Sequence, residues 1–396
     1  MVSDVLSSIE FQMSLLLFIA LAGYLVASRI NQSAVVGEIL VGLIVGPSFL
    51  ALITYTEFIH SIATLGAIIL LFVIGFEFNI KDIVEARYGV IALFGVMIPW
   101  IGGFAISELF GYSFTSALFV GTAMTATSIA ITANVLKEMG KLQTCAAHAI
   151  IGAAVIDDVL SLLFLAITTD MVGGTFTISG VLIVILKAVA FIGIFGYIGI
   201  KYVSPGLMAL DRSAIAEKYP EFVFITAMMI AFFYAMFADL VGLSGIIGAF
   251  LAGVSMESVG LKKSRDLKEG AEYLQIIFAS IFFVSLGVLV NIHELTYTAV
   301  TFLIVLTIIA IITKVIGCGL PARLLGYNTK DSLIIGFGMA PRGEVAMIVA
   351  LIGLSGGIIG QDIYVSIVFM SLLTTIITPL IYRNWFYRDD ECEASS

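Results

Sequence analysis

The amino-acid sequence predicts an all-α polytopic membrane protein of thirteen transmembrane helices. Of its 396 residues, 60% are hydrophobic and 12% are charged, whereas a soluble domain carries about 45–50% apolar and about 25% charged residues. The mean hydropathy is +1.13. This composition excludes a soluble globular protein, because it cannot cover a surface that faces water. It also excludes a disordered chain, which needs low hydrophobicity and high net charge.

Thirteen apolar runs follow one another, divided by polar clusters or by Gly and Pro. A helix needs about 20 mostly apolar residues to cross a bilayer core about 30 Å thick. The ninth run is short, and only Gly111 and Tyr112 divide the fourth from the fifth. The runs are residues 12–28, 34–53, 59–78, 88–110, 114–136, 143–168, 176–200, 221–240, 243–257, 270–290, 296–320, 331–356 and 362–385.

The positions of Lys and Arg predict the orientation. Sixteen of the nineteen cations lie beside alternate loops or in the C-terminal tail, and cytoplasmic loops are the ones enriched in Lys and Arg. The other loops carry acids, such as Asp170 and Asp239. We therefore expect a plasma-membrane protein with its N-terminus outside and its C-terminus in the cytoplasm. The sixteen are Arg29, Lys81, Arg87, Lys137, Lys141, Lys201, Arg212, Lys218, Lys262, Lys263, Arg265, Lys268, Arg323, Lys330, Arg383 and Arg388.

Nothing else in the sequence adds a second domain, so we expect residues 1–396 to form one integral membrane domain. The acidic start, residues 1–10, has the wrong charge for a signal peptide, and Cys145, Cys318 and Cys392 show no paired spacing. There is no Walker A motif and no dinucleotide fingerprint, and we expect no nucleotide-binding tail. Transport would be driven by an ion gradient. We expect no enzyme activity, no cofactor and no nucleic-acid partner, only the lipid bilayer and the transported ions.

A few charges are predicted to lie inside the membrane, where each costs about 2.5–3.5 kcal/mol and therefore pairs or lines a polar cavity. Asp157 and Asp158 stand in the middle of the sixth run, and Lys314 stands in the eleventh. Adjacent helical residues point about 100° apart, so one carboxylate can face a partner helix while the other faces a cavity. Two unpaired carboxylates would not both stay ionised there, so a cation and a proton can compete for the site.

Two of the runs are predicted to be broken at mid-membrane. The twelfth holds Pro341 among three glycines, which interrupts helical hydrogen bonding. The fifth holds four hydroxyl residues within 122–128, which can replace lost backbone partners. Broken helices in matching positions of two halves indicate a transporter site, and an offset of seven runs makes the two halves inverted repeats. Arg342 and Glu344 are predicted to pair beside the second break.

Together these features resemble the monovalent cation:proton antiporter-2 superfamily, and within it the NapA-type sodium/proton antiporters. The resemblance covers essentially the whole chain. Its motifs, in order, are Gly37-Glu38-Ile39-Leu40-Val41-Gly42-Leu43-Ile44-Val45-Gly46-Pro47, Leu71-Phe72-Val73-Ile74-Gly75-Phe76-Glu77-Phe78, Thr125-Ala126-Thr127-Ser128, Ile156-Asp157-Asp158-Val159, Ile281-Phe282-Phe283-Val284-Ser285-Leu286-Gly287, Lys314, and Pro341-Arg342-Gly343-Glu344.

The resemblance implies a fold like that of NhaA and NapA, with two crossed broken helices, and a homodimer that works by an elevator-like movement. Residues 88–168 and 296–385 would be the ion-translocating core. Residues 12–78 and 221–290 would form the scaffold and dimerisation domain, with the first span at the interface. Residues 176–200 would be the linker helix.

The resemblance also implies the residue roles. Asp158 would be the main Na⁺ ligand, with Asp157 as the second acid and the partner of Lys314. Oxygens of Thr125, Thr127 and Ser128 would complete the site. The exchange would move Na⁺ or Li⁺ against protons and would be electrogenic. The residues predicted to support the broken helices are Ala126, Pro341, Arg342, Gly343 and Glu344. His148 is a candidate pH-sensing residue, although a packed histidine is the simpler interpretation.

The same residues allow other functions to be compared with Na⁺/H⁺ exchange. A K⁺/H⁺ antiporter of the same superfamily is the main alternative. A channel would need a filter motif, which is absent. An intramembrane aspartyl protease needs its two acids face to face on different helices, whereas these are adjacent on one helix. A retinal protein could use Lys314, but thirteen spans fit it poorly.

Overall fold

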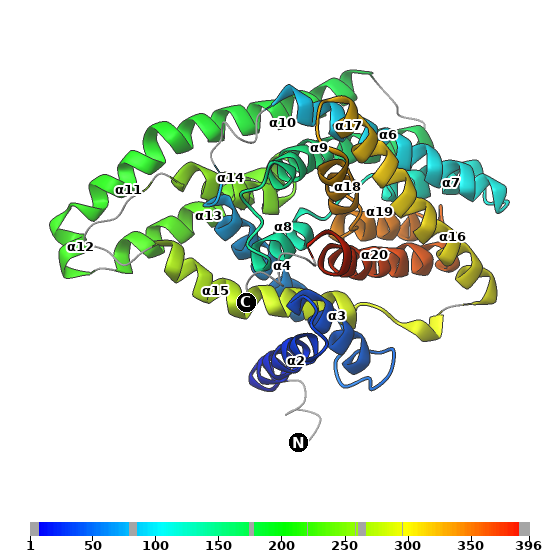
Figure 1. The fold of residues 1–396 in the computed structure, drawn as a ribbon, viewed down its shortest axis with the longest axis horizontal. Coiled ribbons are helices and arrows are strands. Elements are labelled where there is room, and N and C mark those ends of the chain that lie inside the picture. The colour runs from blue at the N-terminus through cyan, green and yellow to red at the C-terminus, as the bar shows by residue number, and fades with distance from the viewer. Residues whose placement is uncertain are drawn as a thin grey trace.

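The computed structural model describes residues 8–78, 85–173, 178–219, 221–257, 259, 267–294 and 296–387, and over these residues the fold is helical (Figure 1). Lys81, Lys262, Lys263, Arg265, Arg388 and Cys392, used above, lie outside them. In this described part, nine helices are long and apolar enough to cross a membrane. They are α2 (Ile9–Arg29), α4 (Glu57–Gly75), α6 (Ala86–Leu109), α9 (Cys145–Gly173), α10 (Ile178–Ile198) with α11 (Ser204–Asp211), α13 (Glu221–Val241), α15 (Leu267–Val288), α16 (Tyr297–Lys314) with α17 (Leu320–Leu324), and α20 (Gln361–Ile381).

The other four predicted spans correspond to shorter helices. Two are single helices, α3 (Ala34–Val45) and α14 (Gly245–Met256). The other two are broken, as predicted. The fifth is α7 (Phe114–Ala123) followed by α8 (Ile129–Glu138), and the twelfth is α18 (Thr329–Gly338) followed by α19 (Glu344–Ser355). The all-helical membrane fold is confirmed, while the exact number of thirteen crossings stays a prediction. A short helix, α12 (Ala214–Lys218), follows α11.

Side-chain caps set where several helices begin. Thr56, Ser113, Ser244 and Asn328 each precede a helix and accept a hydrogen bond from a backbone N–H of its first turn. These caps satisfy donors that a helix start otherwise leaves without a partner. The turn between α13 and α14 closes at Gly242, whose φ of +89° favours glycine. Local sequence therefore explains the separation of these two spans.

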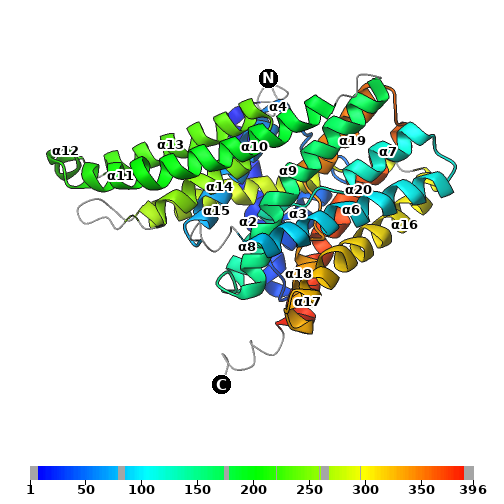
Figure 2. The ribbon, with the colours of Figure 1, turned by 90° about the horizontal axis from the view of Figure 1, so that it is seen from above.

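The helices pack as two groups, which lie side by side in Figures 1 and 2. In the first, α4 packs against α14 and α15, α3 packs against α2 and α15, and α13 packs against α14. In the second, α6 packs against α7, α9 and α16, and α20 packs against α16 and α19. We call them the scaffold group and the crossing group. The division of the chain into an ion-translocating core and a scaffold stays a prediction.

Glycines allow the scaffold helices to approach closely. A Cβ added at Gly253 of α14 would collide with the backbone of Phe72 and Gly75 on α4. At Gly193 of α10, by contrast, an added Cβ would meet nothing within 4 Å. Small residues at helix contacts are how membrane helices gain van der Waals packing without a hydrophobic driving force.

We therefore expect Gly253→Val to destabilise the protein, because the added side chain must push α4 and α14 apart. Overpacking of this kind costs about 1–3 kcal/mol or more. Thermal unfolding in detergent, followed by circular dichroism, should show a clearly lower Tm. Gly193→Val is the matched control and should leave the Tm close to that of the wild type. Equal shifts for both variants would contradict the role given to the α4–α14 contact.

Candidate ion-binding site

The two broken helices meet at their breaks, residues 124–128 and 339–343. The backbone N–H of Ser128 donates to the carbonyl of Pro341 at 2.8 Å, so the two unwound segments pair directly. Inside a bilayer every backbone polar group must find a partner within the protein. This hydrogen bond satisfies one donor and one acceptor that the two interrupted helices leave open.

Arg342 links the breaks a second time. Its side chain is 1% exposed, and Nη1 donates to the carbonyl oxygen of Ala126 at 3.0 Å. The guanidinium therefore lies just past the C-terminal end of α7, where the helix dipole favours a positive charge. The sequence predicted Glu344 as a local partner of Arg342, but the Glu344 side chain lies outside the described residues.

Hydroxyl groups of α20 and of Tyr382, the residue after it, bond either the second break or the part of α18 that precedes it, and the sequence analysis missed them. The Arg342 peptide contacts Thr374 and Thr375, Thr378 donates to the carbonyl of Phe337 at 3.1 Å, and the Tyr382 hydroxyl donates to that of Ile334 at 2.7 Å. The sequence contains a pattern that indicates these contacts, because hydroxyl residues at positions 374, 375, 378 and 382 fall on one face of a helix. It was weak, since hydroxyls in membrane helices usually bond their own backbone.

On α9 the two adjacent aspartates diverge. Asp157 is fully buried, and its Oδ1 accepts a hydrogen bond from Lys314 Nζ at 2.7 Å, in an ion pair with no exposure on either side. Asp158 is 8% exposed and lines a cavity instead. This is the geometry expected of neighbouring residues about 100° apart on a helix.

The surrounding backbone makes room for the ion pair. Lys314 ends α16, and a π-helical turn, Val315–Gly319, follows it directly; such turns are frequent at functional sites. Gly95 of α6 faces this turn. A Cβ there would lie 2.5 Å from Cys318 Sγ, 3.8 Å from Asp157 Oδ1 and 3.9 Å from Lys314 Nζ. A side chain at position 95 would therefore press on the pair.

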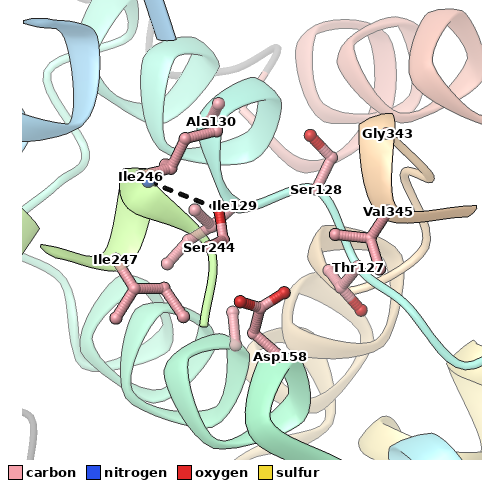
Figure 3. Close-up of a pocket in the computed structure, with 11 residues that line it drawn as sticks. Thr127, Ser128, Ile129, Ala130, Asp158, Ser244, Ile246, Ile247, Gly343 and Val345 are labelled. Carbon is pink, nitrogen blue, oxygen red and sulfur yellow. Dashed lines mark hydrogen bonds between the residues drawn. The ribbon is translucent and has the colours of Figure 1, made fainter. Parts of the chain in front are cut away.

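The cavity beside Asp158 has a volume of about 20 Å³, enough for one water molecule or one small ion. Figure 3 shows the Asp158 carboxylate pointing into it, with Thr127 and Ser128 on one side and Ser244 and Ile246 on the other. Hard cations prefer oxygen ligands, and the carboxylate and hydroxyls supply them. The described residues that line it are Thr127, Ser128, Ile129, Ala130, Ala154, Asp158, Ser244, Ile246, Ile247, Gly343 and Val345.

Two predicted site residues lie elsewhere. Thr125 is fully buried and its Oγ1 donates to the carbonyl of Thr122 at 2.7 Å, so it is not part of the cavity lining in this conformation. His148 lies in the first turns of α9, and its ring meets that of Phe78 edge-on at a centroid distance of 5.2 Å. Its role in pH sensing stays a prediction.

We expect the Asp157–Lys314 pair to behave as a unit in stability. Asp157→Asn or Lys314→Met alone leaves a charge buried without its partner, which typically costs about 3–5 kcal/mol. The double variant removes both charges and should recover at least half of the lost stability. Thermal unfolding of the four proteins in detergent measures this coupling. Simple addition of the two single effects would contradict it.

Comparison with known proteins identifies the family. Residues 15–386 match the family described as "Sodium/hydrogen exchanger, transmembrane". The "Na(+)/H(+)-K(+) antiporter GerN" of Bacillus cereus is 35% identical over 390 residues, 98% of each chain. The "High-affinity Na(+)/H(+) antiporter NhaS3" of Synechocystis is 30% identical over 426 residues, which cover 96% of this chain and 90% of that one.

A solved structure shows the same fold. The sodium proton antiporter MjNhaP1 from Methanocaldococcus jannaschii, at pH 8, has a TM-score of 0.66 at 17% identity, over 94% of this chain and 95% of that one. A second structure of MjNhaP1 has a TM-score of 0.72 at 16% identity, over 96% of both chains. The fold and the matched relatives agree: the chain is a multi-pass membrane protein that belongs to the sodium/hydrogen exchanger family.

Proposed function

We propose that the protein is a secondary antiporter that exchanges cytoplasmic Na⁺ for external protons. The observation that carries the proposal is Asp158, a carboxylate that faces an ion-sized cavity beside the buried Asp157–Lys314 pair. The names of the matched relatives, which are Na⁺/H⁺ antiporters, support it. The protein is accordingly a transporter and not an enzyme, and its substrates are Na⁺ and protons. Li⁺, a smaller hard cation, is proposed as a second substrate.

Exchange follows from competition at one site. An ionised Asp158 attracts a cation, and oxygens of Thr127 and Ser128 replace part of its hydration shell. A proton on the same carboxyl removes the charge that holds the cation. Each ligand therefore displaces the other, because a carboxyl buried in low dielectric favours whichever partner neutralises it. Loaded with either one, the site carries less charge through the membrane.

We further propose that transport is electrogenic. Lys314 is paired with Asp157, the residue next to Asp158 on α9. A cation that binds Asp158 therefore places a second positive charge close to Lys314. The Asp157–Lys314 pair loosens, and Lys314 releases its proton. Two protons would then return for each Na⁺, with net movement of one charge. The 2.7 Å contact between Lys314 Nζ and Asp157 Oδ1 supports this coupling of the two groups.

The cavities and contacts between the groups support an elevator-like movement. A second cavity of about 360 Å³ shares Ser244, Ile246 and Val345 with the Asp158 cavity. A third cavity, of about 400 Å³, lies between α8 and the scaffold group and is lined by Glu138 and Gln275, close to the hydrogen bond that Ser33 donates to Glu138 at 2.6 Å. Both larger cavities lie where the broken helices face the scaffold group, and we propose that the crossing group slides past the scaffold there.

The same proposal includes the division into domains, the orientation in the membrane and the oligomeric state. The core would be residues 88–168 and 296–385, the scaffold residues 12–78 and 221–290, and the linker residues 176–200. The N-terminus would be outside and the C-terminus in the cytoplasm. A homodimer would form through α2. An apolar face of that helix is exposed and carries Phe18, Leu21 and Leu25.

K⁺/H⁺ exchange is the second candidate. The name of the Bacillus cereus relative includes K⁺ as well as Na⁺. K⁺ is larger than Na⁺ but close in radius to a water molecule, so a cavity of about 20 Å³ that holds one water admits either ion by size. Proton efflux from reconstituted protein, measured with Na⁺, Li⁺ and K⁺ in turn, decides between them.

Asp158→Ala is expected to abolish exchange, because it removes the only carboxylate among the described side chains that line the ion-sized cavity. The measurement is Na⁺-dependent proton flux in proteoliposomes after a sodium pulse, and the variant should fall to the level of empty liposomes. Asp170→Asn, on the same helix and away from that lining, is the matched control and should transport. If Asp158→Ala exchanges like the wild type, the site assignment is wrong.

Lys314→Gln is expected to keep exchange while losing its dependence on voltage, because glutamine cannot carry the second proton. The flux assay is repeated with an imposed membrane potential of either sign. The wild-type rate should respond to the potential, and the variant rate should not. An unchanged voltage dependence would remove Lys314 from the role of proton carrier.

A further inference from the structure

Two neighbouring threonines of α20 hold the peptide groups of Arg342. The Arg342 backbone N–H donates to Thr374 Oγ1 at 3.2 Å, and Thr375 Oγ1 donates to the Arg342 carbonyl at 2.9 Å. Both threonines are buried, at 0% and 2% exposure. A single residue of the unwound segment therefore has both of its backbone groups held by one turn of a neighbouring helix.

The directions of these bonds are fixed. The Thr374 hydroxyl gives its own proton to the carbonyl of Ser371 at 3.0 Å, so it is free to accept from Arg342. The Thr375 hydroxyl shares its proton between the carbonyls of Ser371 and Arg342, both at 2.9 Å. One threonine thus acts as acceptor and the other as donor, which matches the N–H and the C=O of one residue. The pair specifies how far residue 342 lies from α20.

This position is transmitted to the ion cavity through the neighbours of Arg342. Pro341 accepts from the Ser128 backbone at 2.8 Å, and Arg342 Nη1 donates to Ala126 at 3.0 Å. Gly343 follows and lines the cavity together with Ser128. The two are so close that a Cβ at Gly343 would lie 2.7 Å from Ser128 Oγ. A shift of residue 342 would therefore move both walls of the cavity.

We propose that Thr374 and Thr375 are positioning residues for cation binding. They set the place of the unwound 341–343 segment and, through it, the oxygens of residues 127 and 128 around Asp158. Neither threonine lines the cavity, so both act on the ion indirectly, through residues 341–343. The proposal deepens the antiport function above and rests on it.

Thr378 provides a matched control. It lies on the same helix, it is 1% exposed, and its hydroxyl donates to the carbonyl of Phe337 at 3.1 Å. Phe337 belongs to α18 and precedes the unwound segment. A Thr378→Val change therefore removes a hydrogen bond made by an equally buried threonine of α20, but not one that holds residues 341–343. If the hydroxyls served only to stabilise the fold, the three valine variants would change the KM for Na⁺ alike.

The experiment measures the apparent KM for Na⁺ and the maximal rate of Na⁺-dependent proton flux in proteoliposomes. Thr374→Val and Thr375→Val keep the side-chain shape and remove the hydroxyl. We expect either to raise the KM about fivefold or more, the equivalent of one lost hydrogen bond, with a smaller change in maximal rate. Thr374→Ser and Thr375→Ser restore the hydroxyl and should restore the KM. Thr378→Val should keep the wild-type KM.

An equal rise in KM for all three valine variants, or no rise in any of them, would overturn the proposal. If the valine variants cannot be recovered from the membrane, Thr375→Cys replaces them, because the thiol is a similarly small but weaker donor. A raised KM in this variant, with a normal KM in Thr375→Ser, supports positioning. A wild-type KM in both overturns it. Flux by the wild type reports separately on the antiport function, since its absence would refute that function and leave the threonines as purely structural groups.

Discussion

The architecture depends on one constraint, which is that backbone polar groups inside a bilayer must be satisfied by the protein itself. Two helices are interrupted in the same region, at residues 124–128 and 339–343, and each interruption frees several N–H and C=O groups. The structure satisfies them by crossing the two breaks. Ser128 bonds Pro341, and Arg342 bonds Ala126. Each break therefore supplies hydrogen-bond partners to the other, which holds the ends of four half-helices together.

The charges follow from that crossing. Breaking two helices creates an opening next to α9, and a carboxylate that faces it meets hydroxyl and backbone groups instead of lipid. Asp158 occupies this position. The adjacent Asp157 turns away and meets Lys314, where Gly95 and the π-helical turn leave space for the pair. Two consecutive acids therefore have different environments because the helix turns by about 100° per residue, and one carboxylate faces the cavity while the other is paired inside the protein.

Much of this could be predicted from the sequence. Apolar runs gave the helices, and Pro341 with its glycines and the hydroxyls of residues 122–128 gave both breaks. The pairing of Asp157 with Lys314 came from the family resemblance, since spacing alone does not bring residues 157 positions apart into contact. The sequence carries only a weak signal for Thr374 and Thr375, because buried threonines more often bond the preceding turn of their own helix, as Thr307 does.

The contacts between the two groups are partly apolar and partly polar. Leu70 and Phe282 of the scaffold group share one buried apolar cluster with Ile91 and Ile150 of the crossing group. Near the end of α8 the contacts are polar, such as Lys137 to Gln275 at 2.7 Å, and a hydrogen bond of this kind contributes only about 1 kcal/mol net because water can replace the partner. Apolar burial has no preferred direction, so a shifted position of the two groups can preserve it. Backbone contacts such as those that glycines allow between α4 and α14 depend on one exact fit, and a sliding movement would therefore occur between the groups and not within the scaffold.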